Sequence, residues 1–171
     1  FCTNYGFCVE YYGANSFVTT SVGDLYHTYN CKKINLICVS DQCASPIKKI
    51  IPTGTGFLVC SHGSFVSIWK RGKRIGDLFK HSSDVIDILC MGDNVLSVDK
   101  SGSLVMWDFL TQCKCITYKI DVYFETMFTD NCQIMSWCHP PTYINKIILG
   151  LASGALWIWN IITCKMIYEI K

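Results

Sequence analysis

Residues 81, 97 and 99 are histidine, serine and aspartate, the residue types of a hydrolase triad. Such a triad needs an exposed serine and an oxyanion hole, and geometry rather than chain order identifies it. No serine here lies in the Gly-x-Ser-x-Gly turn that exposes a nucleophile in many hydrolases. We therefore expect His81, Ser97 and Asp99 to form a structural hydrogen-bond network, and we predict no catalytic residue.

Twelve cysteines are scattered along the chain. The groups nearest to a metal site are Cys113-Lys-Cys115 and Cys132 with Cys138-His139, and neither has the Cys-x-x-Cys spacing of structural zinc sites. A disulfide framework is typical of small secreted chains, whereas a free cysteine behaves as a small buried hydrophobe. We expect free thiols, no metal and a reducing, intracellular compartment.

A short glycine pattern, Gly54-Thr-Gly56, faintly resembles a phosphate-binding loop, but no helix pattern follows it. We interpret it as a hairpin turn, and we expect neither a cofactor nor a small-molecule substrate.

Four cations lie within five residues at Lys70, Arg71, Lys73 and Arg74, joined by Gly72. The cluster could contact RNA phosphates or an acidic partner segment. It could equally be a solvated turn that keeps an apolar sheet soluble. The neighbouring Trp69 is expected to pack within the sheet, so a contact with RNA would be electrostatic and would not involve base stacking.

The elements that must position these residues are four similar windows of thirteen residues, at 17–29, 57–69, 95–107 and 147–159. Each reads as strand, small-residue turn with one glycine, strand and closing aromatic, which is a hairpin pattern. The closing aromatics Tyr29, Trp69, Trp107 and Trp159 are 40, 38 and 52 residues apart. A period near ~40 residues with an aromatic anchor predicts a WD-repeat β-propeller.

The predicted fold is therefore all-β, with about four blades of four antiparallel strands. We place the blades at approximately 5–40, 46–80, 81–120 and 132–171 of one partial propeller, residues 1–171. Four repeats, where such propellers commonly have seven, indicate a fragment. In the third blade the expected strands include 85–91 and 113–120, and a long connection follows at 121–131.

The spacing within the third blade gives His81 and Ser97 their expected role. His81 lies 26 residues and Ser97 ten residues before Trp107, as in WD repeats whose histidine, serine, aspartate and tryptophan share a buried network. Ser101 occupies the usual aspartate position and Asp99 lies two residues earlier, so the network is expected to be re-routed or incomplete.

One stretch invites a different interpretation. Residues 147–164 carry no charge and contain Gly150-x-x-x-Gly154, a pattern found in pairs of membrane helices. The stretch nevertheless aligns with three other hairpin windows, two of which contain charges. We therefore predict a hairpin and no membrane contact.

The sequence resembles the WD-repeat subunit of the UTP-B complex of the small-subunit processome, a family of U3 small nucleolar RNA-associated proteins. The resemblance rests on 17–29 with its tyrosine closure, and on 141–150 continued by Gly154-Ala-Leu156 and Trp159-Asn160. Gly92-Asp93, residues 95–99 and Ile167-Tyr168 fit as well. These residues correspond to part of the family's first propeller.

The resemblance implies a non-enzymatic scaffold in the nucleolus that supports early pre-rRNA processing toward 18S rRNA. Its implied partners are other UTP-B WD-repeat proteins, with the U3 small nucleolar ribonucleoprotein and pre-rRNA contacted directly or indirectly. A net charge of +2 with 16% charged residues carries no strong electrostatic message about partners. Composition thus does not exclude a second hypothesis, in which the protein is a generic WD-repeat adaptor that binds peptides in transport or ubiquitin ligation.

Overall fold

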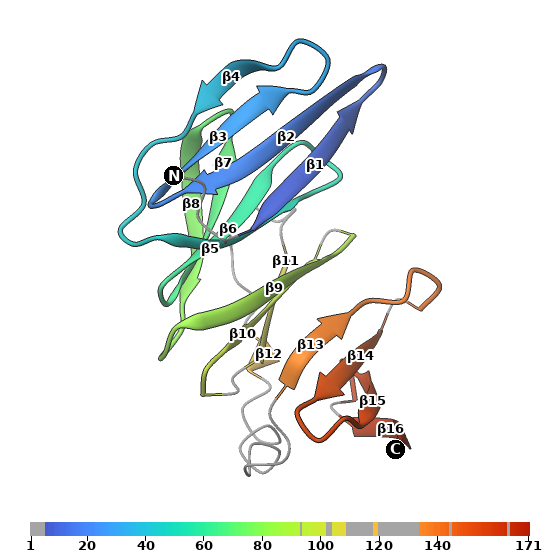
Figure 1. The fold of residues 1–171 in the computed structure, drawn as a ribbon. Coiled ribbons are helices and arrows are strands. Elements are labelled where there is room, and N and C mark those ends of the chain that lie inside the picture. The colour runs from blue at the N-terminus through green and yellow to red at the C-terminus, as the bar shows by residue number, and fades with distance from the viewer. Residues whose placement is uncertain are drawn as a thin grey trace. The chain divides into compact units, whose positions relative to one another are not determined.

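The fold consists of β-sheets. A computed structural model describes residues 6–92, 94–101, 104–108, 118–119, 134–143, 145–163 and 165–171. Every regular element among them is a strand, and the strands form four antiparallel sheets of four (Figure 1). The all-β prediction is confirmed. The expected connection at 121–131, Gly102 and most of the strand expected at 113–120 lie outside the described residues.

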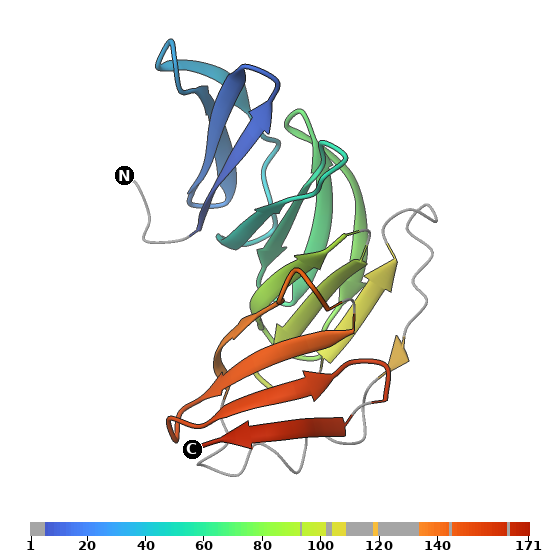
Figure 2. The same cartoon turned by 90° about the vertical axis from the view of Figure 1, so that its right-hand side faces the viewer.

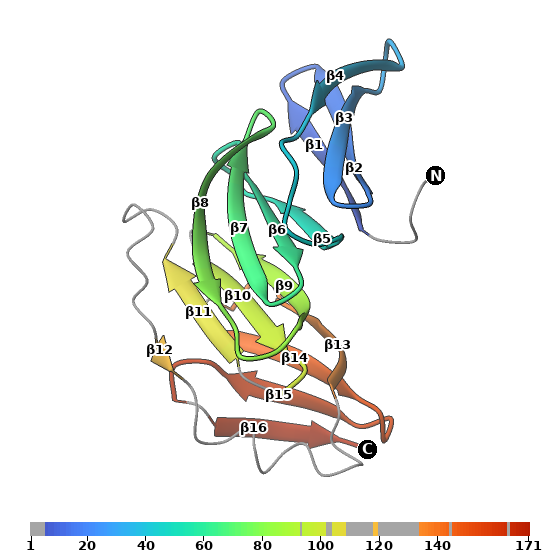
Figure 3. The ribbon, with the colours of Figure 1, turned by 90° about the vertical axis from the view of Figure 1, so that its left-hand side faces the viewer.

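Within each sheet the strands follow one another in chain order. The first sheet contains β1 (Phe7–Tyr12), β2 (Asn15–Val22), β3 (Leu25–Asn30) and β4 (Asn35–Val39). The second contains β5 (Ile47–Pro52), β6 (Leu58–His62), β7 (Phe65–Lys70) and β8 (Lys73–Lys80), which lie side by side in Figure 3. The third contains β9 (Val85–Met91), β10 (Asn94–Asp99), β11 (Leu104–Asp108) and β12 (Tyr118–Lys119). The fourth contains β13 (Ile134–Cys138), β14 (Lys146–Leu151), β15 (Leu156–Asn160) and β16 (Lys165–Ile170), orange to red in Figure 2.

The four sequence windows are the central hairpins of these sheets. Val22 pairs with Leu25 and His62 with Phe65, so each of these hairpins closes through a two-residue loop. The first loop residue is Gly23 (φ 67°) in one case and Gly63 (φ 54°) in the other. Glycine adopts this left-handed conformation at little cost, which is why a glycine turn lies at the centre of these two windows.

The chain divides into two compact units. One holds the first three sheets, except for Leu104 and Lys119, and the other holds the fourth sheet. Within the first unit, the core lies between successive sheets. Tyr26 and Cys8 of the first sheet are buried with Ile47, Cys60 and Trp69 of the second. Each sheet thus buries one face against the next, as in repeat architectures.

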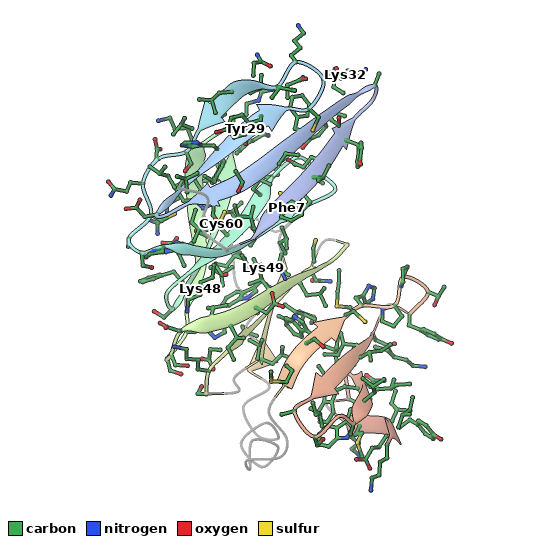
Figure 4. All side chains as sticks on the ribbon, in the orientation of Figure 1. Phe7, Tyr29, Lys32, Lys48, Lys49 and Cys60 are labelled. Carbon is green, nitrogen blue, oxygen red and sulfur yellow. The ribbon has the colours of Figure 1, made fainter. Side chains whose placement is uncertain are left out.

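The second and third sheets pack in the same manner. Val59, Val66 and Ile68 form one cluster with Val85 and Trp107. Two ion pairs reinforce this contact from β5: Lys48 Nζ lies 3.2 Å from Asp84 Oδ2, and Lys49 Nζ lies 3.0 Å from Asp87 Oδ1. Figure 4 labels the two lysines.

The fourth sheet includes the uncharged stretch 147–164. Its residues form β14 and β15 rather than a helix, and Ile147, Leu149 and Leu151 are buried in alternation along β14. A period of two is that of a strand with one covered face. In the described part of the chain, no helix is long and apolar enough to cross a membrane.

Candidate interaction site

The first candidate constellation, His81, Ser97 and Asp99, forms one chain of hydrogen bonds with Trp107. The Trp107 indole Nε1 donates to Ser97 Oγ at 2.9 Å, and Ser97 Oγ lies 2.7 Å from His81 Nε2. His81 Nδ1 lies 3.2 Å from Asp99 Oδ2. Because an ionised carboxylate only accepts, Nδ1 carries the proton and Nε2 accepts from the serine hydroxyl. Every bond then has one donor and one acceptor.

This network is sealed from solvent. His81 is 2% exposed, and Ser97, Asp99 and Trp107 are fully buried. Burial lowers the pKa of His81, an effect that the Asp99 carboxylate partly offsets. A serine that no substrate can reach cannot act as a nucleophile, so the role of these residues is structural. They tie the segment that enters the third sheet to its central hairpin.

Asp99 supplies the carboxylate of this network, and Ser101 supports it. The Ser101 backbone N–H and hydroxyl donate to Asp99 Oδ1 at 2.9 and 2.6 Å. The carboxylate of the network therefore comes from Asp99, two residues before the position where WD repeats usually have aspartate. Ser101 occupies that position here.

The second sheet has its own network, which the sequence analysis missed. The Trp69 indole Nε1 donates to Ser67 Oγ at 2.7 Å, and Ser67 Oγ lies 3.0 Å from His62 Nε2. The positions 26 and ten residues before Trp69 are Cys43 and Val59, so spacing could not reveal it. The available signal was strand alternation, because Ser67 and Trp69 are two residues apart on β7 and share a face.

Tyr29, the expected anchor of the first sheet, is only partly buried, and Tyr26 is buried instead. Trp69 packs against the preceding sheet, with its ring 5.7 Å from that of Tyr26 in an edge-to-face arrangement. Tyr29 pairs with Val18 as Trp69 pairs with Leu58, so it points to the corresponding face of its own sheet. Within the described residues of this unit no earlier sheet covers that face, which explains the exposure of Tyr29. Trp159 on β15 is 2% exposed.

The basic cluster forms the tip of the β7–β8 hairpin. Its two loop residues, Arg71 (φ 50°) and Gly72 (φ 80°), both have positive φ, which is the geometry of a type I′ turn. Lys73 Nζ lies 2.7 Å from Asp41 Oδ1, and Arg74 pairs with Asp77 on the same strand. Two of the four cations are therefore already paired with carboxylates.

The other two cations, Lys70 and Arg71, remain available. The Lys70 ammonium lies 4.4 Å from the centre of the Phe57 ring. Both residues are exposed, and in the part of the chain that the structure describes no carboxylate pairs with either one. Of the four cations predicted as an interaction surface, Lys73 and Arg74 therefore have described carboxylate partners, and Lys70 and Arg71 do not.

Hydrogen bonds also hold the β7–β8 turn against the first sheet. The Gly72 N–H donates to the Tyr26 hydroxyl at 3.1 Å, and the Asp41 N–H donates to the Gly72 carbonyl at 2.8 Å. A Cβ at position 72 would lie 2.5 Å from Cys38 Sγ and 2.7 Å from the Val39 carbonyl oxygen. Only glycine allows this approach.

A groove of about 650 Å³ lies beside the fastened turn, between the first two sheets. Tyr12 and Phe17 of the β1–β2 hairpin, Ile37 of β4, and Lys70 and Arg71 line it. Thr55 and Gly56, in the turn between β5 and β6, complete its wall.

The buried thiols Cys8 and Cys43 are held in their protonated form. Burial raises the pKa of Cys8 to about 12 and that of Cys43 to about 11, so these thiols stay protonated. Among the described residues, no three His, Cys, Asp or Glu side chains are placed to share a metal. Cys113, Cys115 and Cys132 lie outside those residues, and His139 Nε2 lies 2.6 Å from the Tyr143 carbonyl oxygen.

Four-stranded antiparallel sheets with tryptophan-centred hydrogen-bond networks place this fold in the class of WD-repeat β-propellers. The WD40 β-propeller domain of Doa1 superimposes with a TM-score of 0.68 over 96% of this chain and 53% of that chain. The two sequences are only 11% identical, so the likeness is one of fold.

Sequence comparison then identifies the family. The family model "WDR36/Utp21 first beta-propeller" matches residues 18–171. The U3 small nucleolar RNA-associated protein 21 homolog of Schizosaccharomyces pombe is 32% identical over 96% of this chain and 18% of its own length. Human WD repeat-containing protein 36 is 32% identical over 89% of this chain and 16% of its own length. The chain belongs to the WDR36/Utp21 first-propeller family, and it spans less than a fifth of the length of these two relatives.

Proposed function

We propose that the protein is a non-enzymatic scaffold subunit in ribosome biogenesis that supports assembly of the small-subunit processome and processing of pre-18S rRNA. The observation that carries this proposal is the family match over residues 18–171, joined by a relative whose name associates it with the U3 small nucleolar RNA. The proposed partners are other UTP-B WD-repeat proteins and the U3 small nucleolar ribonucleoprotein, and the proposed location is the nucleolus.

The internal chemistry supports a scaffold. In the described residues, the histidine–serine–aspartate constellation is buried and serves packing. What a propeller offers to partners is its turns and sheet edges, and fold alone assigns these no function. Within this role, we assign Lys70 and Arg71 as the contact surface of the basic turn, with Lys73 and Arg74 as its supports.

The test is affinity purification of the full-length protein, with the co-purifying proteins identified and the co-purifying RNA sequenced. Recovery of U3 small nucleolar RNA and UTP-B subunits is expected. Recovery of coat or ubiquitin-ligase subunits without U3 would instead support a generic WD-repeat adaptor and overturn the proposal.

A further inference from the structure

We propose that the groove between the first two sheets is a docking site for a short acidic segment of a partner protein that also carries apolar side chains. This inference deepens the scaffold role by naming the kind of partner segment. The groove volume, about 650 Å³, lies within the ~300–1,000 Å³ range of ligand pockets, which is room for a few side chains.

Charge favours an acidic occupant. Lys70 and Arg71 stand on one side of the groove, and Glu10 is the carboxylate that lines it. The Tyr12 hydroxyl donates to Glu10 Oε1 at 2.8 Å, which occupies part of that carboxylate. The two cations have no carboxylate partner among the described side chains. A carboxylate of an acidic partner segment would provide the missing partner for Lys70 and Arg71.

The groove wall is built before any partner arrives. The bonds from Gly72 to Tyr26 and from Asp41 to Gly72, with the Lys73–Asp41 ion pair, fix the turn against the first sheet. A turn whose backbone is already fixed loses less conformational entropy on binding.

Arg71 adds an independent indication. Its φ of 50° lies in the left-handed region, which favours glycine, asparagine and aspartate over arginine. Strained residues of this kind cluster at binding sites. Arg71 is also one of the residues that line the groove.

The lining favours a protein segment over RNA. Ile37, which is 52% exposed, is an aliphatic member of the lining and offers an apolar contact. The Tyr12 ring packs edge-to-face with Phe17, with centroids 5.9 Å apart, and its hydroxyl is bonded to Glu10. An RNA strand would leave the apolar lining unused, and its affinity would rest on the two cations alone.

Fluorescence anisotropy with the full-length protein tests the proposal. The probe is a fluorescein-labelled peptide of alternating aspartate and leucine, and the comparison probe alternates lysine and leucine. Arg71→Asn removes the charge but keeps a residue that tolerates positive φ, so it should weaken binding about three- to fivefold. The matched control is Lys32→Asn, which removes one charge from the β3–β4 turn outside the groove (Figure 4) and should leave binding unchanged.

Two further variants separate the site from general charge attraction. Glu10→Gln should tighten binding of the acidic peptide, because it removes the carboxylate that repels it. Ile37→Ser should weaken binding without any change in charge. Equal losses in Arg71→Asn and Lys32→Asn, or equal binding of both peptides, would overturn the proposal. So would an oligouridine probe that binds in an Arg71-dependent manner while the acidic peptide does not.

The two proposals fail separately. Peptide binding with the expected variant pattern would stand even if no U3 RNA co-purified with the protein. Recovery of U3 with no peptide binding would retain the scaffold role and reject the groove.

Discussion

Trp107 and His81 stabilise the third sheet through a single hydroxyl, that of Ser97. The serine oxygen accepts from the indole and lies within hydrogen-bond distance of the imidazole, so removal of either ring takes away one of these two partners of a buried hydroxyl. The second sheet repeats the principle with His62, Ser67 and Trp69.

Removal of the Trp107 indole should lower the stability of the fold. Trp107→Ala is expected to lower the free energy of unfolding of the intact propeller by about 3–5 kcal/mol, because it empties a large packed site. Ile86→Ala, at a position 42% exposed on β9, is the matched control and should cost less than about 0.5 kcal/mol. Urea unfolding followed by tryptophan fluorescence measures both. Similar, small effects of the two substitutions would contradict the role of Trp107.

The buried histidines should make stability depend on pH. Burial lowers the pKa of both His81 and His62 from the usual 6.5, and Arg74 lowers that of His62 further. The unfolded chain then takes up protons before the folded chain does. Stability is therefore full above about pH 6.5 and falls as the pH drops toward the lowered pKa values.

Urea midpoints measured across a pH series check this expectation. The double variant His81→Gln, His62→Gln should lose the part of the decline that begins near pH 6.5. If the double variant retained the whole pH dependence, other groups would be responsible for it.

Among the elements, the β7–β8 hairpin has the most specific role, because its tip contacts a neighbouring sheet. Gly72→Ala should destabilise the propeller by on the order of 3 kcal/mol, since it combines a φ of 80° with the close approach to Cys38 and Val39. Gly13→Ala is the control, because Gly13 has a φ of 59° with open space around it and should cost only about 1 kcal/mol. Equal losses on denaturation would show that the contact between the sheets contributes nothing.

The same hairpin carries the proposed contact charges. Reversal of Lys70 and Arg71 to glutamate in the full-length protein should leave folding intact, because neither residue is paired with a carboxylate in the described structure. It should weaken co-sedimentation with the large ribonucleoprotein particle and make the remaining binding less salt-dependent. Reversal of Lys73 or Arg74 is unsuitable, since it would place glutamate beside Asp41 or Asp77.

The control for this reversal is the pair Lys32→Glu, Lys33→Glu, which changes the charge equally at the β3–β4 turn. Co-sedimentation of the Lys70, Arg71 variant that equals wild type across a salt series would reduce the turn to a solubilising surface.

For the molecule as a whole, the outward face of the first sheet is the most consequential feature. Phe7 and Tyr11 on β1 are 71% and 77% exposed, and Val9 lies between them on the same side of the strand. Val9, Val18 and Tyr29 face the same way, because directly paired residues share a face. An apolar sheet face of this kind favours association.

The 171-residue chain alone is therefore expected to self-associate in dilute buffer. Sedimentation velocity should show oligomers that dissociate in the double variant Phe7→Ser, Tyr11→Ser. Ile34→Ser, at a more exposed position in a turn, should have no such effect because Ile34 is not part of this face. A monodisperse monomer of the unaltered chain would contradict the expectation.

The sequence alone predicted the features that arise within one repeat. The hairpin windows follow from strand alternation and a glycine turn, and the third-sheet network follows from the spacing of His81, Ser97 and Trp107. Such features are local, since the residues that specify them lie within one blade.

The tertiary structure decided which faces and charges remain free. Tyr26 meets Gly72 across 46 residues and Lys73 meets Asp41 across 32, so no local pattern could show that the basic turn is held against the first sheet or that Lys73 is paired. Tyr29 occupies the position of Trp69 in its own hairpin, yet it is not sealed, because burial depends on the adjacent sheet and not on the strand itself. The packing of one sheet against the next therefore determined the candidate site.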